Sequence, residues 1–156
     1  MSDFRNDTAT LEAISNHKKR KERVVFTNGC FDILHVGHSR YLTEAKNLGD
    51  LLVVGINSDS SVSSLKGPER PVIPEDERKE MLLALRAVDY VFVFNEETPL
   101  ELIHAVKPDV LVKGGDWPID KIVGSDFVIK QGGDVKSLSF YEGHSSTNII
   151  EKVKRL

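Results

Sequence analysis

Residues Thr27–His38 read Thr-Asn-Gly-Cys-Phe-Asp-Ile-Leu-His-Val-Gly-His, and this stretch decides the fold. The apolar, β-branched run Val24–Thr27 that leads into it is typical of a buried strand. Gly29 allows a tight turn, and a helix is expected to begin near Val36 or Gly37. The stretch therefore predicts a strand, a turn and a helix N-terminus, whose free N–H groups and positive dipole favour an anion.

His35 and His38 stand three residues apart at this helix start, so both imidazoles can face one anion. Gly37 between them leaves room for a bulky group, and together these features predict a polyphosphate pocket. Two alternatives remain open: a zinc site with Cys30 or Asp32 as a third ligand, and ordinary polar residues at a helix start. Neither a Walker-type lysine nor a G-x-G-x-x-G sequence follows the strand.

Further strand candidates lie outward along the chain. They are Leu51–Ile56, Tyr90–Phe94, Val110–Val112 and the weaker Val135–Leu138. Continuous apolar runs of this kind are typical of parallel strands covered on both faces. The sequence therefore predicts an α/β protein with a Rossmann-like open parallel five-stranded sheet and helices on both faces. Ligands of such sheets bind at the carboxyl ends of the strands.

The segments between these strands have helical patterns. Predicted helices are Val36–Leu48 with Gly49 as the C-cap, Pro74–Arg86 with acidic residues in its first turn, a helix from a Thr98–Glu101 capping box to Val106, and a last helix from Ser145 or Ser146 to Arg155. The basic run His17–Arg23 is interpreted as the solvated end of an N-terminal helix, in preference to a nucleic-acid or phosphate patch.

Length and composition narrow the classes of protein. The chain has 156 residues, enough for one domain, and its net charge of −3 argues against a duplex-DNA binder while leaving room for a local basic pocket. One cysteine excludes an internal disulfide and a cysteine-rich metal site. Because no apolar run approaches a membrane span and no signal region begins the chain, a cytoplasmic protein is expected, with neither nucleic acid nor membrane as partner.

The stretch Gly29–His38 resembles the signature of the H-x-G-H nucleotidyltransferases of the cytidylyltransferase-like superfamily. Four further segments follow in the order that this likeness requires: Asn57–Asp59, Lys66–Val72, Lys113–Trp117 and Glu142–Ile150. Together they resemble the heptose 1-phosphate adenylyltransferases, which make ADP-heptose for bacterial lipopolysaccharide. In many bacteria this activity is one half of a bifunctional protein with a sugar kinase, and a chain of this length resembles the free-standing form.

The resemblance implies transfer of AMP from ATP to D-glycero-β-D-manno-heptose 1-phosphate, with pyrophosphate as the second product. It implies the nucleotidyltransferase fold for a single domain at residues 24–156, after a helical extension at residues 1–23, and a homodimer. Mg²⁺ is expected with ATP, held mainly by phosphate oxygens, and no protein ligand of a metal is named. Because the sugar phosphate arrives ionised, the reaction needs positioning and charge stabilisation rather than a side-chain base.

The resemblance also assigns site residues. Those expected to act on the reacting phosphates are His35, His38, Lys66 and Arg78. Those expected to bind the nucleotide are Thr27, Asn28, Gly29, Phe31, Asp32, Gly37, Arg70, Lys113, Gly115, Asp116, Ser145, Ser146 and Thr147. Asp32 is interpreted as fixing the turn rather than as a base, and no role is assigned to His144.

Plainer interpretations stay open for several of these residues. Lys66 and Arg70 follow the second strand on a predicted loop, which could simply be solvated. Arg78 lies in a helix first turn, where a cation suggests an anionic partner, or else a salt bridge with Glu75 or Glu77. Trp117 is either a packing residue or a contact to the sugar.

Two other functions compete with the leading hypothesis. One is a cytidylyltransferase acting on glycerol 3-phosphate or another polyol phosphate, which would share the same motifs. The other is a nucleotide-binding module without catalysis. The presence of both histidines together with the hydroxyl cluster of residues 145–147 argues against the binding module.

Overall fold

A parallel five-stranded sheet forms the centre of the chain. In this computed structural model, which describes residues 3–156, the strand order is β3-β2-β1-β4-β5. The strands are β1 (Val24–Gly29), β2 (Leu51–Asn57), β3 (Tyr90–Phe94), β4 (Val110–Gly114) and β5 (Asp134–Leu138). The predicted Rossmann-like α/β sheet is therefore confirmed. Its order reverses at β1, which pairs with both β2 and β4, so the switch point lies at the carboxyl end of β1.

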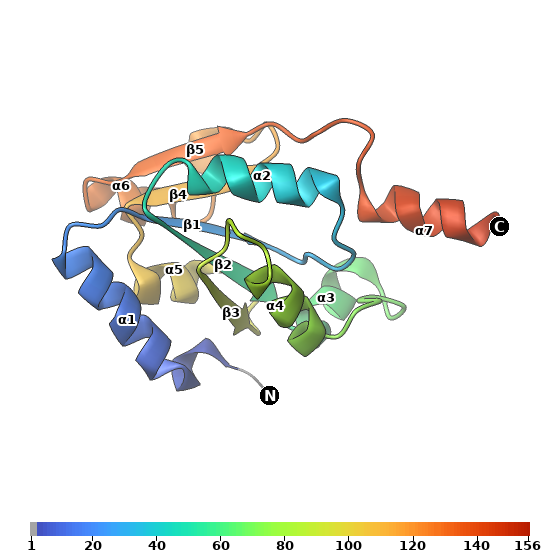
Figure 1. The fold of residues 1–156 in the computed structure, drawn as a ribbon, viewed down its shortest axis with the longest axis horizontal. Helices are drawn as coiled ribbons and strands as arrows, with labels where there is room; N and C mark the ends of the chain where they lie inside the picture. The colour runs from blue at the N-terminus through green and yellow to red at the C-terminus, as the bar shows by residue number, and fades with distance from the viewer. Residues whose placement is uncertain (1–2) are drawn as a thin grey trace.

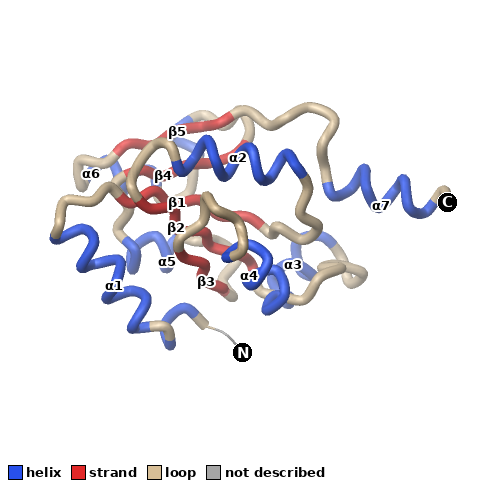
Figure 2. Tube along the Cα trace, in the orientation of Figure 1, coloured by secondary structure: helices blue, strands red, loops and turns tan. Residues whose placement is uncertain are grey.

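Helices cover both faces of this sheet (Figures 1 and 2). They are α1 (Thr8–Lys19), α2 (Val36–Lys46), α3 (Asp59–Lys66), α4 (Glu75–Leu83), α5 (Leu100–Val106), α6 (Ser125–Lys130) and α7 (Ser146–Lys154), with short 3-10 turns at Phe4–Asn6 and Ile119–Lys121. Side chains of α1, α5 and α6 pack on one face, and those of α2 and α4 on the other. Residues of β1 alternate between the two layers: Phe26 belongs to the first and Val25 to the second.

The N-terminal segment packs into the body of the domain. Phe4 and Ile14 are buried in the same hydrophobic cluster as the side chains of α5. The helix α1 ends at Lys19, and Lys18 then donates to Asp109 with 2.9 Å between Nζ and Oδ1. Part of the basic run is thus used in ion pairs, and Phe4 and Ile14 of the N-terminal segment share one core with the strands and α5.

Several helix limits differ from the predictions. The prediction of a capping box at Thr98 is wrong, because α5 begins at Leu100. Its N-cap is Pro99, which makes no side-chain hydrogen bond. The helix α2 ends at Lys46, before Gly49. A Cβ on Gly49 would lie 2.6 Å from the carbonyl oxygen of Arg23, so this glycine permits a close backbone approach rather than capping the helix.

Two helices were not predicted, α3 and α6. The segment that forms α3 is rich in serine and was interpreted as part of a loop, which is wrong. Ser58 caps it by accepting a hydrogen bond from the Ser61 N–H at 3.2 Å, and Val62 is fully buried beneath it. Lys66 is consequently the last residue of a helix rather than a loop residue.

The helix α7 differs from the others because none of its residues is buried. Figure 1 shows it extending away from the sheet, with the C-terminus at its far end. Within residues 3–156, no helix has the length and apolar character needed to cross a bilayer.

Candidate functional site

A cavity of about 660 Å³ lies at the carboxyl ends of β1 and β4, next to the switch point of the sheet. Its walls come from the loop after β1, the start of α2, the end of α3, the end of β4 and the segment of residues 140–148. The predicted site residues that line it are Asn28, Gly29, Phe31, Asp32, His35, Gly37, His38, Lys66, Lys113, Ser145, Ser146 and Thr147. The structure thus brings together segments from both ends of the sequence.

The two histidines of the motif stack face to face at the start of α2. Their ring centroids are 3.9 Å apart, with the planes inclined by 28°. The backbone N–H of His35 donates to Nδ1 of His38 at 3.3 Å, which leaves the proton of a neutral His38 on Nε2. His38 can therefore donate from Nε2 to an oxygen of a ligand.

Both imidazoles are biased toward the neutral form. Burial, followed by the charges of His35 and Lys66, lowers the pKa of His38 to about 4. Burial, followed by the charge of His144, lowers the pKa of His35. Within residues 3–156, the buried Nδ1 of His35 finds no hydrogen-bond partner. A buried nitrogen without a partner is unfavourable, so this atom indicates a place for a ligand oxygen or a water molecule.

The loop between β1 and α2 is shaped by an aromatic ring. Phe31 adopts a left-handed backbone conformation with φ of 48°, and its ring lies 5.3 Å from that of His38. A Cβ on Gly29 would approach the Phe31 ring to 3.0 Å. Glycine at position 29 therefore makes room for the ring that supports His38.

Asp32 ties this loop to the segment before α4. Its carboxylate is nearly fully buried and accepts hydrogen bonds from the backbone N–H groups of Val72 and Ile73 and from Nε of Arg70 at 2.6 Å. These hydrogen bonds join the loop after β1 to residues 70–73. Arg70 is turned to Asp32 and is not among the residues that line the cavity.

We expect Asp32→Asn to lower the free energy of unfolding by about 2 kcal/mol near neutral pH, the scale of hydrogen bonds to a charged group. Burial raises the pKa of Asp32, but the N–H groups of Ile73 and Val72 and the Arg70 guanidinium outweigh it and hold that pKa below its usual value. Because its pKa is lower in the folded protein, ionised Asp32 stabilises the fold at pH values above the ordinary aspartate pKa. This stabilisation is lost as the pH falls through the pKa of Asp32 in the folded state. Urea unfolding should therefore show the two proteins converging under acid; an equal gap at every pH would contradict this account.

Arg78 does not lie where a residue that binds phosphate in the cavity would be expected. Its side chain is 1% exposed and does not line the cavity. Nε donates to the carbonyl of Ile73 at 2.9 Å, and Nη1 donates to the carbonyls of Cys30 and Asn57 at 2.7 and 2.9 Å. Nη2 pairs with Asp59 at 2.8 Å. The guanidinium thus joins three segments around the site, and its buried position leaves it out of reach of a phosphate in the cavity.

Two lysines supply the positive charge of the cavity. Lys66 comes from the end of α3 and Lys113 from β4, so one lysine comes from a helix and the other from a strand. Burial lowers the pKa of Lys113, and the neighbouring Cys30 opposes this effect. An anion in the cavity would offset the cost of the partial burial of Lys113.

Gly114 and Gly115, at the end of β4, form a small platform that lies against the aromatic rings of neighbouring residues. Phe140 and Tyr41 lie so close to Gly114 that a Cβ there would approach them to 3.1 and 3.3 Å. At Gly115, whose φ is +101°, a Cβ would lie 2.8 Å from Phe140 and 3.1 Å from Trp117. Phe140 is 71% exposed, which is unusual for a large aromatic side chain inside a cavity wall.

Besides Arg70, three predicted nucleotide-binding residues lie outside the cavity wall, namely Thr27, Gly115 and Asp116. Thr27 is fully buried and shares a 2.6 Å hydrogen bond with the hydroxyl of Tyr41. Burial raises the pKa of Tyr41 to about 12. Thr27 therefore supports the cavity through Tyr41.

The start of α7 closes the cavity on the side of α2. Ser145 is the N-cap and accepts a hydrogen bond from the Asn148 N–H at 3.0 Å. Ser146 Oγ donates to the carbonyl of Ile33 at 3.0 Å, which fastens α7 to the loop before α2. The predicted cap is confirmed, and two helix N-termini converge on one cavity.

The predicted site set lacks several residues of the cavity wall, among them Tyr41, Phe140, Tyr141 and His144. Tyr41 falls on the apolar face of a predicted helix, so its pattern indicates only core packing. The other three belong to the irregular segment before α7. The one available signal was the nearness of Phe140 and His144 to the hydroxyl cluster in the sequence.

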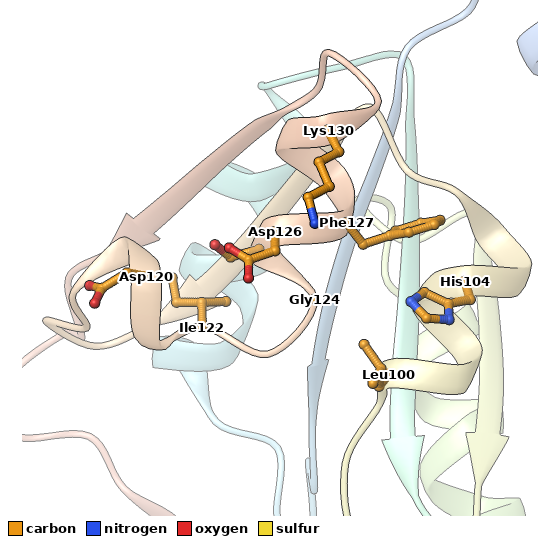
Figure 3. A pocket seen from close by; sticks show the side chains of 9 residues that line it. Leu100, His104, Asp120, Ile122, Gly124, Asp126, Phe127 and Lys130 are labelled. Atoms are coloured by element: carbon orange, nitrogen blue, oxygen red, sulfur yellow. The ribbon is translucent and has the colours of Figure 1, made fainter.

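A second cavity of about 380 Å³ lies between α5 and α6 (Figure 3). His104 of α5 faces Phe127 of α6 with 4.2 Å between ring centroids, and Asp126 and Lys130 also line this cavity. This cavity contains none of the residues of the H-x-G-H stretch.

The arrangement does not favour a metal site built by the protein. Among residues 3–156 there is no group of three or more histidine, cysteine, aspartate or glutamate side chains that could hold an ion. Cys30 directs its Sγ toward Asn57, and the Asp32 carboxylate is already bonded. The zinc alternative lacks its third ligand for this reason.

Comparisons with known proteins agree with this geometry. A family model described as cytidylyltransferase-like matches residues 26–152. "Bifunctional protein HldE" of Trichlorobacter lovleyi is 53% identical over 152 residues, which are 97% of this chain and 31% of that protein. The same-named protein of Syntrophotalea carbinolica is 54% identical over 91% of this chain and 29% of its own length. The chain thus spans about a third of the length of these relatives.

Solved structures show the same fold. A lipopolysaccharide core biosynthesis protein from Thermoplasma volcanium has a TM-score of 0.61 and 31% identity, covering 79% of this chain and 99% of that one. A pantothenate synthetase from Thermus thermophilus has a TM-score of 0.58 at 19% identity, covering 86% of this chain and 64% of that one, and shares the fold alone.

Proposed function

The chain belongs to the cytidylyltransferase-like family, and from this premise we propose that it transfers AMP from ATP to D-glycero-β-D-manno-heptose 1-phosphate. The products are ADP-heptose, for the core of lipopolysaccharide, and pyrophosphate. One observation carries the proposal: two stacked histidines, two lysines and two helix N-termini converge on one cavity. Such a collection of donors and positive charge suits a polyphosphate.

In this reaction, a phosphate oxygen of the sugar phosphate attacks the α-phosphorus of ATP, and the bond from that phosphorus to the bridging oxygen of pyrophosphate breaks. The attacking oxygen is already ionised, so no residue has to remove a proton. His38 donates from Nε2 to a phosphate oxygen, and Lys66 and Lys113 stabilise the charge that spreads over the transition state. Positioning and electrostatics then supply the rate enhancement.

Mg²⁺ is part of the substrate in this proposal. The carboxylate of Asp32 is engaged by Arg70 and two backbone N–H groups. The ion would arrive with ATP, held mainly by phosphate oxygens and water, which is the usual mode of Mg²⁺.

Two comparisons support the heptose assignment over a polyol one. The relatives named HldE match nearly the whole chain, and the Thermoplasma volcanium neighbour is named for lipopolysaccharide core biosynthesis. The rival is a cytidylyltransferase for glycerol 3-phosphate, which would use the same phosphate site.

The proposal also includes a cytoplasmic location and a homodimer. Sedimentation equilibrium tests whether the protein is a dimer.

Pyrophosphate release over a panel of nucleoside triphosphates and acceptor phosphates tests the function. We expect release only when ATP and the heptose 1-phosphate are both present. Release only with CTP and glycerol 3-phosphate would overturn the heptose assignment. An absence of release with every pair, while nucleotide still binds, would favour a binding module without catalysis.

We expect Phe140→Ala to raise the KM for ATP by about tenfold and to change kcat by less than about twofold, because stacking of a base on an aromatic ring contributes about 1–3 kcal/mol. Phe140 lies exposed above Gly114 and Gly115, where a purine could stack on its ring. Steady-state kinetics measure both constants. Ile129→Ala, a change at an exposed apolar residue of α6, is the control; equal KM values for the two variants would remove the stacking role.

A further inference from the structure

His144 lies against the start of α2, although it belongs to the segment between β5 and α7. A Cβ on Gly37 would lie 3.0 Å from the Cβ of His144 and 2.9 Å from Nδ1 of His35. The rings of His35 and His144 have centroids 6.1 Å apart and planes inclined by 24°. Since His35 also stacks on His38, the three imidazoles form a row with His35 in the middle.

A side-chain hydrogen bond holds the segment of His144 against the loop before α2. Ser146 fastens the start of α7 to the carbonyl of Ile33, two residues before His35. Ser145 is occupied as the N-cap of α7, so its hydroxyl is partly used within the helix. His144, the residue just before this cap, is exposed and lines the same cavity as the other two histidines.

The positive charge of the cavity that His144 lines comes from two lysines. Lys66 of α3 and Lys113 of β4 line the same cavity as His144. Burial lowers the pKa of both His35 and His38, and the charge of His144 lowers the pKa of His35 further, so these two rings are biased toward the neutral form. Glu142 lies on the same segment as His144 and is exposed, and the carboxylate of Asp32 is held by Arg70.

We propose that His144 is a third imidazole of the phosphate site and binds the part of the triphosphate that leaves as pyrophosphate. The platform of Gly114 and Gly115 under Phe140 lies at β4, and the imidazole row lies between α2 and α7. A base at β4 therefore directs the terminal phosphates toward His144. The proposal rests on the proposed function in taking a nucleoside triphosphate as the ligand, but it needs neither a particular base nor a particular acceptor.

Calorimetric titration with inorganic pyrophosphate tests this role, because the probe is common to every nucleoside triphosphate. At about pH 6.5, where a histidine can carry a proton, we expect His144→Gln to weaken binding about tenfold, the scale of one lost hydrogen bond to a charged group. At about pH 8.5 the difference should shrink to about twofold, since a neutral imidazole and an amide are similar donors. Titrations in two buffers of different ionisation enthalpy should show fewer protons taken up by the variant than by the wild type.

Two further variants sharpen the outcome. His144→Lys keeps a positive charge at both pH values, so its affinity for pyrophosphate at about pH 8.5 should equal or exceed that of the wild type. His104→Gln removes a histidine of the second cavity and should leave affinity and proton uptake unchanged.

The inference is overturned if His144→Gln binds pyrophosphate as tightly as the wild type with the same proton uptake, or if His144→Lys loses affinity as His144→Gln does. A wild type that binds no pyrophosphate would overturn it as well. Failure of the proposed function looks different: pyrophosphate binds with the expected dependence on His144, but ATP and the heptose 1-phosphate give no product.

Discussion

Replacement of His38 by alanine is expected to lower kcat by about 100-fold or more, the scale of losing one preorganised donor that stabilises charge in a transition state. Its Nδ1 accepts the backbone N–H of His35, so its Nε2 proton is directed away from the backbone. Because the pKa of His38 is lowered to about 4, a neutral ring would act as the donor at neutral pH before the triphosphate binds. His35→Ala should have a loss of the same order, since the ring of His35 stacks on that of His38.

Single-turnover and steady-state rates of pyrophosphate formation measure this loss. His104→Ala is the matched control, because His104 lies between α5 and α6 in a separate cavity. Circular dichroism establishes that each variant is folded. A folded His38→Ala protein with a rate within about twofold of the control would remove His38 from the catalytic account.

Replacement of Arg78 by methionine is expected to lower the free energy of unfolding by about 3 kcal/mol or more, because it removes the donor of three backbone carbonyls. The guanidinium satisfies the carbonyls of Ile73, Cys30 and Asn57. Methionine fills similar space but leaves these acceptors without their donor, and each unsatisfied buried group costs about 1–3 kcal/mol. The segments that Arg78 joins carry Asp32 and Lys66, so activity should fall with stability.

Urea unfolding monitored by circular dichroism measures the change. Lys79→Met is the matched control from the next position of α4, where the lysine is partly exposed and lies 3.9 Å from Asp7. We expect this control to remain within about 0.5–1 kcal/mol of the wild type, as for exposed ion pairs. If Arg78→Met unfolds at the same urea concentration as Lys79→Met, the bracing role of Arg78 is contradicted. Arg78→Lys, which keeps the charge but loses the planar fork, should fall between the two.

The sheet could be predicted from the sequence because its strands are buried on both faces. Burial of that kind requires continuous apolar runs, and the run Tyr90–Phe94 coincides with β3 at both ends. At β1 the apolar run stops at Thr27, but the strand continues to Gly29, because Asn28 and Gly29 still pair with β2. Pairing in the sheet, rather than side-chain character, sets that end.

The helix α3 could not be predicted because its stability comes from tertiary contacts. Four of its eight residues are serines, and serine favours caps and turns over helix interiors. The helix forms because Ser58 caps it and Val62 is buried against the sheet. Neither contact leaves a helical pattern in the sequence.

The H-x-G-H residues of the site could be predicted from the sequence, whereas residues from other segments could not all be predicted. The H-x-G-H residues are adjacent in the sequence, so their spacing alone places both rings at one helix start. The inward direction of Arg78 could not be predicted, because sequence does not tell whether a cation in a first turn faces carbonyls or a ligand. Phe140 and His144 reach the cavity through an irregular segment, whose path depends on the contact between Ser146 and Ile33.

One competition measurement tests the central claim most directly. The protein is incubated with Mg²⁺, equal concentrations of ATP and CTP, and equal concentrations of D-glycero-β-D-manno-heptose 1-phosphate and glycerol 3-phosphate, and the nucleotide product is identified by mass spectrometry. The account predicts ADP-heptose as the main product, in an amount equal to the pyrophosphate released. CDP-glycerol as the main product would contradict it.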